Sequence, residues 1–277
     1  MTYFELKKYI SGRLAVKCGE LADYEAMLFI RALCGISGTE FLLRMKDTAV
    51  YDESALESFI TRRINGESAE YIIGETYFFD LRIKLSRDCL VPRADTEFVV
   101  EKALNFVQKG SRTADLCTGS GCIAIAIAKH GGAYAEGFDI SRGAIETASC
   151  NAAENGVADR VKFHVADVKN DVLRGEYDVI ISNPPYIKSA DIAALSPEVL
   201  CEPHIALDGG EDGMDFYRAI LSYAPRHLKK GGRIVFEIGY DEENEMRLLC
   251  AEKGLDCDIF RDYGGNPRAA VIYKKGE

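Results

Sequence analysis

Apolar residues in the first 75 positions recur every three or four residues, which predicts amphipathic helices. Two such stretches lie at about residues 4–14 and 26–33, and Gly35 and Gly38 mark the end of the second. A third helix is expected to start at Asp52 and to stop at Asn65 and Gly66. No strand-like alternation interrupts this region, so a small helical bundle is predicted for residues 1–75.

The pattern changes at Phe79, where apolar and polar residues alternate strictly through the sequence FDLRIKLS to Ser86. Strict alternation predicts a strand with one buried face. Residues 76–92 are therefore expected to form a β-hairpin or an extended connector that Pro92 closes. Asp95 or Thr96 can cap a following helix that runs to about residue 109.

From residue 111 onward, predicted strands and helices alternate, which indicates a doubly wound, mostly parallel sheet in an α/β fold. The expected strands are Thr113–Leu116, Tyr134–Asp139, Val161–Ala166, Tyr177–Ser182, Arg233–Ile238, Asp256–Phe260 and Ala269–Tyr273. The expected helices are Gly121–Lys129, Arg142–Glu154, Asp212–Leu228 and Glu242–Lys253. The last two strands are joined by DYGGNPR without a helix, so they must pair antiparallel. Residues 93–277 are predicted to form this second domain.

Composition is ordinary for a globular protein, and the charge does not suggest one that binds nucleic acid. The 277 residues are 47% hydrophobic and 28% charged, enough for a sizeable core. The formal net charge of −10 divides into −3 over residues 1–75 and −7 over the rest. Neither part has the basic excess of a protein that grips phosphates, although a local basic groove stays possible.

The nine cysteines are odd in number and form no CxxC pair, and none of the four histidines is near Cys117 or Cys122 in sequence. This spacing predicts reduced thiols in the cytoplasm and no metal site. The start of the chain is amphipathic and carries Glu5, unlike a signal peptide. No apolar run reaches the roughly 18–20 residues of a membrane span, so no membrane association is expected.

The first candidate site is a glycine turn, DLCTGSG, between a predicted strand and a predicted helix. Gly119 and Gly121 allow the backbone to pass close to a ligand and let the helix start tightly. The spacing is neither that of a pyrophosphate-binding loop nor that of a P-loop. A purely structural strand–helix turn is the alternative.

Acidic residues at the ends of the next two strands add to this turn. Asp139 can accept hydrogen bonds from ribose hydroxyls. Asp167 can meet an adenine amino group, and Ile140 and Val168 offer apolar contact to the ring. A nucleoside cofactor without phosphates fits this set. Taken singly, either aspartate is as well explained as a helix N-cap.

The second candidate site is the tetrapeptide Asn183-Pro184-Pro185-Tyr186, which follows the apolar strand YDVIIS. The two prolines fix the backbone and remove two N–H donors. The side-chain carbonyl of Asn183 and the main-chain carbonyl of Pro184 can then accept hydrogen bonds from a planar NH2 group. Tyr186 offers a flat face for stacking.

This set suits methylation of an amide or exocyclic amine, whose nitrogen is a poor nucleophile because its lone pair is delocalised. Two acceptors can polarise the nitrogen and aim it at an electrophilic methyl group, so the work is positioning and electrostatics. Neither a metal nor a covalent nucleophile is needed. A proline-rich structural turn is the alternative.

Several segments together resemble the release-factor glutamine N5-methyltransferases, also called HemK or PrmC, which are class I S-adenosylmethionine-dependent methyltransferases. The resemblance covers most of residues 71–277. The segments that carry it are VPRADTE, DLCTGSGCIAIAIA, FDIS, SNPPYI, EPHIALDGGEDGMDFYR, GGRIVFEIG and RDYGGNPR. NPPY alone is shared with adenine-N6 methyltransferases, but the combination is more specific.

The resemblance implies residue roles. The family's cofactor positions correspond to Cys117, Thr118, Gly119, Ser120, Gly121, Asp139, Val168 and Asn183, and its substrate-amide positions to Asn183, Pro184, Pro185 and Tyr186. It also implies a Rossmann-like fold, S-adenosylmethionine as donor with S-adenosylhomocysteine as product, and the glutamine of the GGQ tripeptide in peptide-chain release factors as substrate. Residues 1–75 are similar in size to the family's substrate-recognition domain, and a monomer is expected.

Two departures from the family pattern affect the cofactor turn and its surroundings. Cys117 stands where glycine is usual, and Val168 stands where an aromatic residue is often found. The alternatives left open are methylation of a glutamine in a ribosomal protein, adenine-N6 methylation of nucleic acid, and a binding module with an inactive site.

Overall fold

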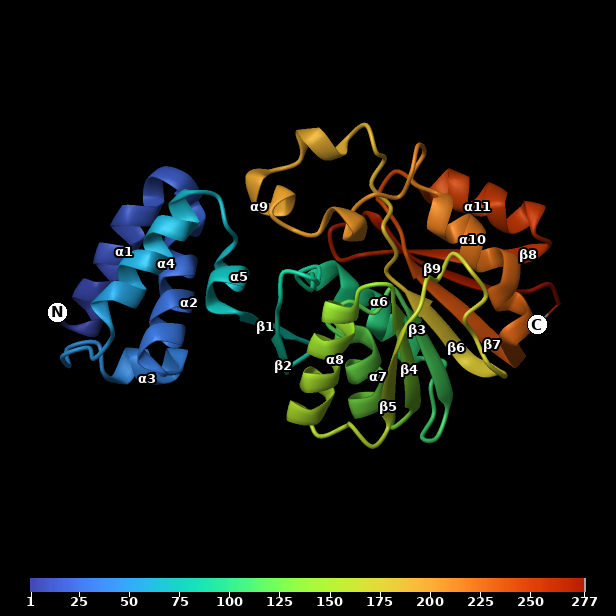
Figure 1. The fold of residues 1–277 in the computed structure, drawn as a ribbon, viewed down its shortest axis with the longest axis horizontal. Helices are drawn as coiled ribbons and strands as arrows, with labels where there is room; N and C mark the ends of the chain where they lie inside the picture. The colour runs from blue at the N-terminus through green and yellow to red at the C-terminus, as the bar shows by residue number, and fades with distance from the viewer. Residues whose placement is uncertain (277) are drawn as a thin grey trace. The chain divides into compact units, whose positions relative to one another are not determined.

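The computed structural model describes residues 1–276 and divides them into two units (Figure 1). Unit 1 consists of residues Met1–Glu75 together with the short segment Ser196–Cys201. Unit 2 consists of Thr76–Leu195 and the chain from Glu202 onward. The unit boundary is therefore crossed three times by the chain.

Unit 1 is a bundle of short helices, as the apolar spacing predicted. Its elements are α1 (Tyr3–Cys18), the 3₁₀ turn η1 (Gly19–Leu21), α2 (Ala22–Cys34), α3 (Gly38–Leu43), α4 (Glu53–Ile64), α5 (Ala69–Ile73) and, from the second segment, α9 (Pro197–Leu200). Asp52 caps α4 by accepting hydrogen bonds from the backbone N–H groups of Ser54 and Ala55. Leu6 and Leu14 of α1 pack with Phe29 of α2 in a core that excludes water.

A buried ion pair joins three elements of unit 1. The guanidinium of Arg63 donates to both carboxylate oxygens of Glu25, at 2.6 and 2.9 Å, and to Glu198 at 2.9 Å. Its side chain is only 6% exposed. Because a buried charge requires a partner, this contact holds α2, α4 and α9 together.

Unit 2 begins with a two-stranded hairpin, β1 (Glu75–Phe78) and β2 (Leu81–Lys84). The alternation predicted for this segment is present, since Leu81 and Ile83 are buried. The expected strand start at Phe79 is wrong, because Phe79 and Asp80 both have positive φ, at 50° and 62°. Two consecutive residues of this kind form the tight turn that suits the twist of a hairpin.

The centre of unit 2 is a seven-stranded sheet with the order β5-β4-β3-β6-β7-β9-β8. All neighbouring pairs are parallel except those that include β9, which runs antiparallel to both β7 and β8. The strands are β3 (Arg112–Leu116), β4 (Tyr134–Asp139), β5 (Val161–Val165), β6 (Tyr177–Ser182), β7 (Leu228–Glu237), β8 (Leu255–Arg261) and β9 (Pro267–Lys274). The predicted doubly wound sheet with an antiparallel final pair is confirmed.

Helices cover both faces of this sheet (Figure 1). Side chains of α6, α7 and α8 pack on one face and those of α10 and α11 on the other. These helices are α6 (Ala94–Leu104), α7 (Cys122–Gly131), α8 (Arg142–Glu154), α10 (Asp215–Tyr223) and α11 (Glu243–Glu252), with 3₁₀ turns η2 (Ile192–Ala194), η3 (His204–Ala206) and η4 (Ala224–His227). Over residues 1–276, no helix combines the length and apolar character that crossing a membrane requires.

Candidate active site

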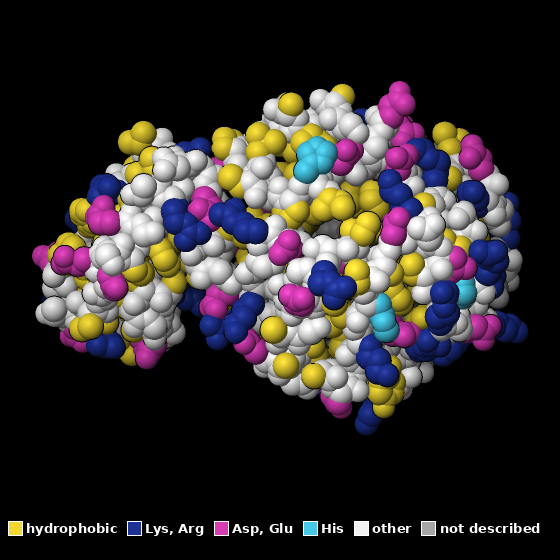
Figure 2. Space-filling model, viewed as in Figure 1, with side chains coloured by type: hydrophobic (Ala, Val, Ile, Leu, Met, Phe, Trp, Pro, Cys, Tyr) yellow, Lys and Arg dark blue, Asp and Glu magenta, His cyan; other side chains and the backbone are white. Residues whose placement is uncertain are grey.

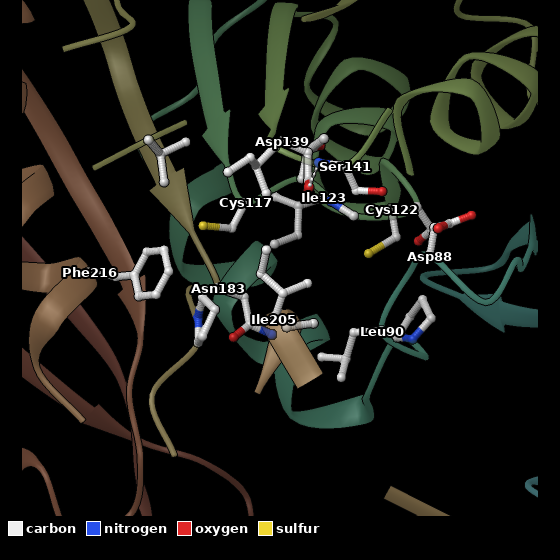
Figure 3. Close-up of a pocket in the computed structure, with 18 of the residues that line it drawn as sticks. Asp88, Leu90, Cys117, Cys122, Ile123, Asp139, Ser141, Asn183, Ile205 and Phe216 are labelled. Atoms are coloured by element: carbon white, nitrogen blue, oxygen red, sulfur yellow. Dashed lines mark hydrogen bonds between the residues drawn. The ribbon is translucent and has the colours of Figure 1, made fainter. Parts of the chain in front are cut away.

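A cavity of about 340 Å³ opens where the parallel strands end. Leu116 of β3 lies beside Phe138 of β4 and Ser182 of β6, so the loops after these strands start at one level. Most of the predicted site residues line the cavity: Cys117, Thr118, Gly119, Ser120, Asp139, Ile140, Asp167, Val168, Asn183 and Pro185. Figure 3 shows Cys117, Asp139 and Asn183 around this hollow, and hydrophobic side chains gather around it on the surface in Figure 2.

The glycine turn brings backbone to the wall of the cavity. Cys117 has a φ of 61° and Gly119 one of 52°, both in the left-handed region. Asp115 stabilises this turn. Its carboxylate accepts a hydrogen bond from the Thr118 hydroxyl at 2.5 Å and another from the Ala124 N–H at 3.2 Å. Burial raises the pKa of Asp115 to about 7.

Gly121 lies outside the cavity lining, and its role in the structure is packing. A Cβ at this position would come within 2.9 Å of Ala148 on α8 and of the Phe163 ring on β5. Its φ of 80° is also in the region that favours glycine. Gly121 therefore lets α7 begin close to its neighbours, which places the preceding turn at the cavity.

Asp139 lies at the end of β4, and both of its carboxylate oxygens accept hydrogen bonds from the backbone. One accepts a hydrogen bond from the Gly119 N–H and the other from the Ser141 N–H, each at 2.9 Å. Burial raises the pKa of this carboxyl, against the effect of the backbone donors. Each oxygen retains a second lone pair, so Asp139 can still accept hydrogen bonds from a ligand in the cavity.

The opposite part of the wall combines Asp167 and Val168 with an aromatic ring that the sequence did not predict. Asp167 accepts hydrogen bonds from the Lys169 N–H and from Asn170, while Val168 is 4% exposed. Phe216, from α10, also lines the cavity (Figure 3). The aromatic surface that is missing at position 168 is thus provided by a residue 48 positions later in the chain.

Asn183 follows β6 directly and reaches the cavity together with Pro185. Its amide Nδ2 donates a hydrogen bond of 3.2 Å to the hydroxyl of Thr96 on α6. No described residue donates a hydrogen bond to its carbonyl oxygen, which leaves that oxygen available to a ligand.

Pro184 and Tyr186 are not part of the cavity lining. Pro184 is buried, and Tyr186 is half-buried with its hydroxyl donating to Glu237 at 3.3 Å. Burial is the main cause that raises the pKa of the tyrosine, so it stays protonated at neutral pH. The structure thus brings Asn183 and Pro185 to the same cavity as the glycine turn, and the Tyr186 hydroxyl contacts the Glu237 carboxylate.

Sequence reasoning missed Thr96 as a neighbour of Asn183, and it missed Glu237 altogether. The sequence indicates Thr96 only as a possible helix cap, and Glu237 is the final residue of β7 with 1% exposure. A charged residue at the end of the apolar run RIVFE is the sequence signal that could have identified Glu237 as a candidate functional residue. Ile205 and Ala206, in the loop after β6, also line the cavity and carried no such signal.

The parallel sheet with a reversed final strand, and a nucleoside-sized cavity at its carboxyl edge, define a class I methyltransferase. Among solved structures, a methyltransferase from Pyrococcus furiosus has this fold, with a TM-score of 0.57, 21% identity, and coverage of 78% of this chain and 98% of that one. Residues 95–210 match the model of the methyltransferase small domain, and residues 5–74 match that of the PrmC N-terminal domain.

Curated relatives extend this match over nearly the whole chain. The release factor glutamine methyltransferase of Agrobacterium fabrum is 38% identical over 275 residues, which cover 95% of each chain. That of Bradyrhizobium diazoefficiens is also 38% identical, over 97% of this chain and 93% of its own. The chain therefore belongs to the release factor glutamine methyltransferase family, and the resemblance seen in the sequence is confirmed.

Membership in this family and the fold make S-adenosylmethionine the methyl donor, and the cavity fits it. Gly119 leaves the turn without a Cβ facing the ligand. Ser120 lines the cavity, and its buried hydroxyl has no hydrogen-bond partner among residues 1–276. The Ser120 hydroxyl and the remaining lone pairs of Asp139 belong to one cavity lining, and a polar nucleoside ligand can supply hydrogen-bond partners there.

Proposed function

We propose that this enzyme transfers a methyl group from S-adenosylmethionine to the side-chain amide nitrogen, N5, of the glutamine in the GGQ motif of peptide-chain release factors. One observation carries this proposal. Asn183 lies in the same cavity as the Asp139 carboxylate, and its carbonyl oxygen has no hydrogen-bond partner within residues 1–276. A hydrogen-bond acceptor at this position can bind an N–H group of a substrate amide.

In the proposed mechanism, the cofactor supplies an electrophilic methyl group on a sulfonium. Asn183 Oδ1 and the Pro184 carbonyl oxygen accept the two amide hydrogens, so that the nitrogen lone pair is turned toward the methyl group. Pro185 fixes the turn, and Tyr186, which follows it outside the cavity lining, is proposed to stack its ring on the plane of the carboxamide. Holding the reacting atoms in line provides most of the acceleration in such a reaction.

The cofactor side of the site is proposed in the same terms. Asp139 binds the ribose hydroxyls, with the backbone of Cys117, Thr118, Gly119, Ser120 and Gly121 forming the turn under the ligand. Asp167 accepts a hydrogen bond from the adenine amino group, and Ile140 and Val168 contact the ring. The lining residues Asp139, Ile140, Asp167 and Val168 support this assignment because all four face one cavity.

We further propose that residues 1–75 form a substrate-recognition domain, residues 76–92 a connector and residues 93–277 the methyltransferase domain. The match of residues 5–74 to the PrmC N-terminal domain supports this division. We also propose that the enzyme acts as a monomer in the cytoplasm, where its nine cysteines stay reduced.

The test offers three substrates to the purified enzyme with labelled S-adenosylmethionine: a release factor, a ribosomal protein and adenine-containing DNA. Label is expected on the release factor alone, and peptide mass spectrometry should locate it on the GGQ glutamine. A release factor with glutamate at that position is the matched control and should stay unlabelled. Label on the DNA or on the ribosomal protein, with none on the release factor, would reject the proposal.

Acidic and basic side chains are interspersed on the face shown in Figure 2, which agrees with a protein substrate better than with a nucleic acid.

A further inference from the structure

A chain of polar side chains leads from Asn183 into the interior of unit 2. Thr96 accepts a hydrogen bond from Asn183 Nδ2 at 3.2 Å, and its hydroxyl donates one of 2.6 Å to Glu237 Oε2. Tyr186 donates to the other oxygen of Glu237 at 3.3 Å. Glu237 therefore contacts, directly or through one hydroxyl, two of the residues proposed to hold the substrate amide.

The number of protons in this chain determines which way the Asn183 amide faces. A threonine hydroxyl has one hydrogen, and an ionised Glu237 can only accept. The Thr96 hydroxyl must therefore donate its single hydrogen to Glu237, and it can only accept a hydrogen bond from Asn183. The NH2 group of Asn183 then points to Thr96, and the carbonyl oxygen is directed elsewhere.

If the amide were turned the other way, Thr96 would have to donate to Asn183 as well, and the 2.6 Å contact with Glu237 would lose its hydrogen. Two acceptor atoms would then face each other in a site where Thr96 is 2% and Glu237 1% exposed. An unsatisfied contact of this kind is costly where water cannot enter. The chain thus selects the amide orientation that leaves Oδ1 as the free acceptor.

We propose that Thr96 and Glu237 are positioning residues that lock the Asn183 carbonyl oxygen, and the ring of Tyr186, in the orientation that the substrate amide requires. This inference rests on the proposed function, since it explains how an acceptor is kept facing the substrate. Neither residue needs to touch the substrate or the reacting atoms for this role.

The groups around Glu237 act in opposite directions on the ionisation of its carboxyl. Besides Thr96 and Tyr186, Arg268 on β9 favours the ionised carboxylate and Asp95 on α6 opposes it. Arg268 is itself paired with Asp95 at 3.1 Å and Asp262 at 3.4 Å. Burial is the dominant effect and raises the pKa of Glu237 to about 7.

The principal experiment compares Thr96→Val with Thr96→Ser in the full-length enzyme, with a release factor as substrate. Valine keeps the shape of threonine and removes the hydroxyl, so kcat is expected to fall roughly 10- to 100-fold through misplacement of Asn183. The affinity for S-adenosylhomocysteine should change little. Serine restores the hydroxyl and should recover most of kcat.

A matched control is Thr113→Val on β3, where threonine is equally buried and its hydroxyl makes only a 3.5 Å contact with a backbone carbonyl. This variant loses the same group outside the cavity and should keep its kcat. The inference is overturned if Thr96→Val keeps wild-type kcat, or if Thr96→Ser is as impaired as Thr96→Val. Should the wild-type enzyme itself leave release factors unmethylated, the proposed function fails instead.

A second variant keeps the inference open to test if Thr96→Val does not fold. When Glu237 takes up a proton it can donate to Thr96, which frees the threonine hydrogen to turn the Asn183 amide. The wild-type kcat should therefore fall as the pH drops through about 7, and Glu237→Gln, which cannot ionise, should flatten that fall. Parallel pH profiles for the two proteins would contradict the positioning role.

Discussion

At the scale of single residues, the site depends on a few side chains whose surroundings leave one atom unused. Asn183 has its NH2 group engaged by Thr96 and its carbonyl oxygen without a partner among the described residues. Asp139 has two oxygens that each accept one backbone hydrogen bond and retain a further lone pair. Cys117 differs from these two residues because its backbone, at the cavity wall, has a positive φ although the residue carries a Cβ.

Replacing Asn183 by alanine should remove one of the two acceptors for the substrate amide. We expect kcat to fall by roughly 10²-fold or more, as for the loss of one preorganised polar group in other active sites. Calorimetric titration should show an affinity for S-adenosylhomocysteine within a few fold of the parent, because Asp139 and the glycine turn are unchanged. Full turnover in this variant would show that Asn183 does not hold the amide.

The strain at Cys117 can be measured with two substitutions. With a φ of 61°, any residue that has a Cβ is held there in a conformation that glycine adopts freely. Cys117→Gly and Cys117→Ala both remove the thiol, but only glycine removes the Cβ. Denaturant unfolding should find the glycine variant more stable than the alanine variant by about 1 kcal/mol. Equal stability, or a more stable alanine variant, would show that the turn is unstrained.

At the scale of elements, parallel strands and the starts of helices place these residues. The end of β3 carries the glycine turn, the end of β4 carries Asp139, and the end of β6 carries Asn183. Gly121 lets α7 start against α8 and β5, which determines where the turn before it lies. The position of the glycine turn therefore depends on how α7 packs.

Gly121→Ala tests that packing, with Gly156→Ala as a matched control. Both glycines have positive φ, 80° and 69°, so both variants bear backbone strain. At Gly121 the new methyl would also meet Ala148 and Phe163 at 2.9 Å, whereas at Gly156 it would meet nothing within 4 Å. We expect Gly121→Ala to be the less stable by about 1–3 kcal/mol, with weakened cofactor binding. Similar losses of stability in both variants would mean that α7 has room to move.

The elements themselves could be predicted from the sequence, because apolar periodicity depends on neighbours in the chain. The strand Tyr177–Ser182 and the helix Arg142–Glu154 were predicted with the limits that the structure has. The turn at Phe79 and Asp80 was not, since Asp80 tolerates a positive φ but an aromatic residue such as Phe79 rarely adopts one. The Thr96–Glu237 contact joins residues 141 positions apart, and no local pattern reports such a pairing.

At the scale of the whole molecule, the chain combines a helical unit with an α/β unit whose interior holds several carboxyl groups. Burial raises the pKa of Asp115, Glu237 and Glu242 each to about 7. These groups make the stability of the enzyme depend on pH in the range up to about neutral. Interior carboxyls of this kind are frequent at functional sites.

The sign of this dependence follows from proton binding. Unfolded Asp115 has its ordinary pKa of 3.8, while the folded carboxyl has a pKa of about 7. Between these values the folded state holds a proton that the unfolded state has lost, so the free energy of unfolding falls as the pH rises. The stabilisation is fully present below about pH 4 and is lost by the time the pH has passed 7.

Asp115→Asn removes this titration and should keep the hydrogen bonds from Thr118 and Ala124 through its amide oxygen. Denaturant unfolding at a series of pH values should show the variant gaining stability relative to the parent as the pH rises from about 4 to above 7. A difference between the two proteins that stays constant over this range would mean that Asp115 is ionised throughout.

The central claim is that a glutamine amide is held at Asn183 with its nitrogen toward the methyl donor. A crystal structure with S-adenosylhomocysteine and a peptide containing the GGQ sequence measures this directly. We predict the amide nitrogen at hydrogen-bond distance, about 3 Å, from both Asn183 Oδ1 and the Pro184 carbonyl oxygen. A glutamine side chain bound with its amide oxygen in that place, or bound away from Asn183 altogether, would contradict the account.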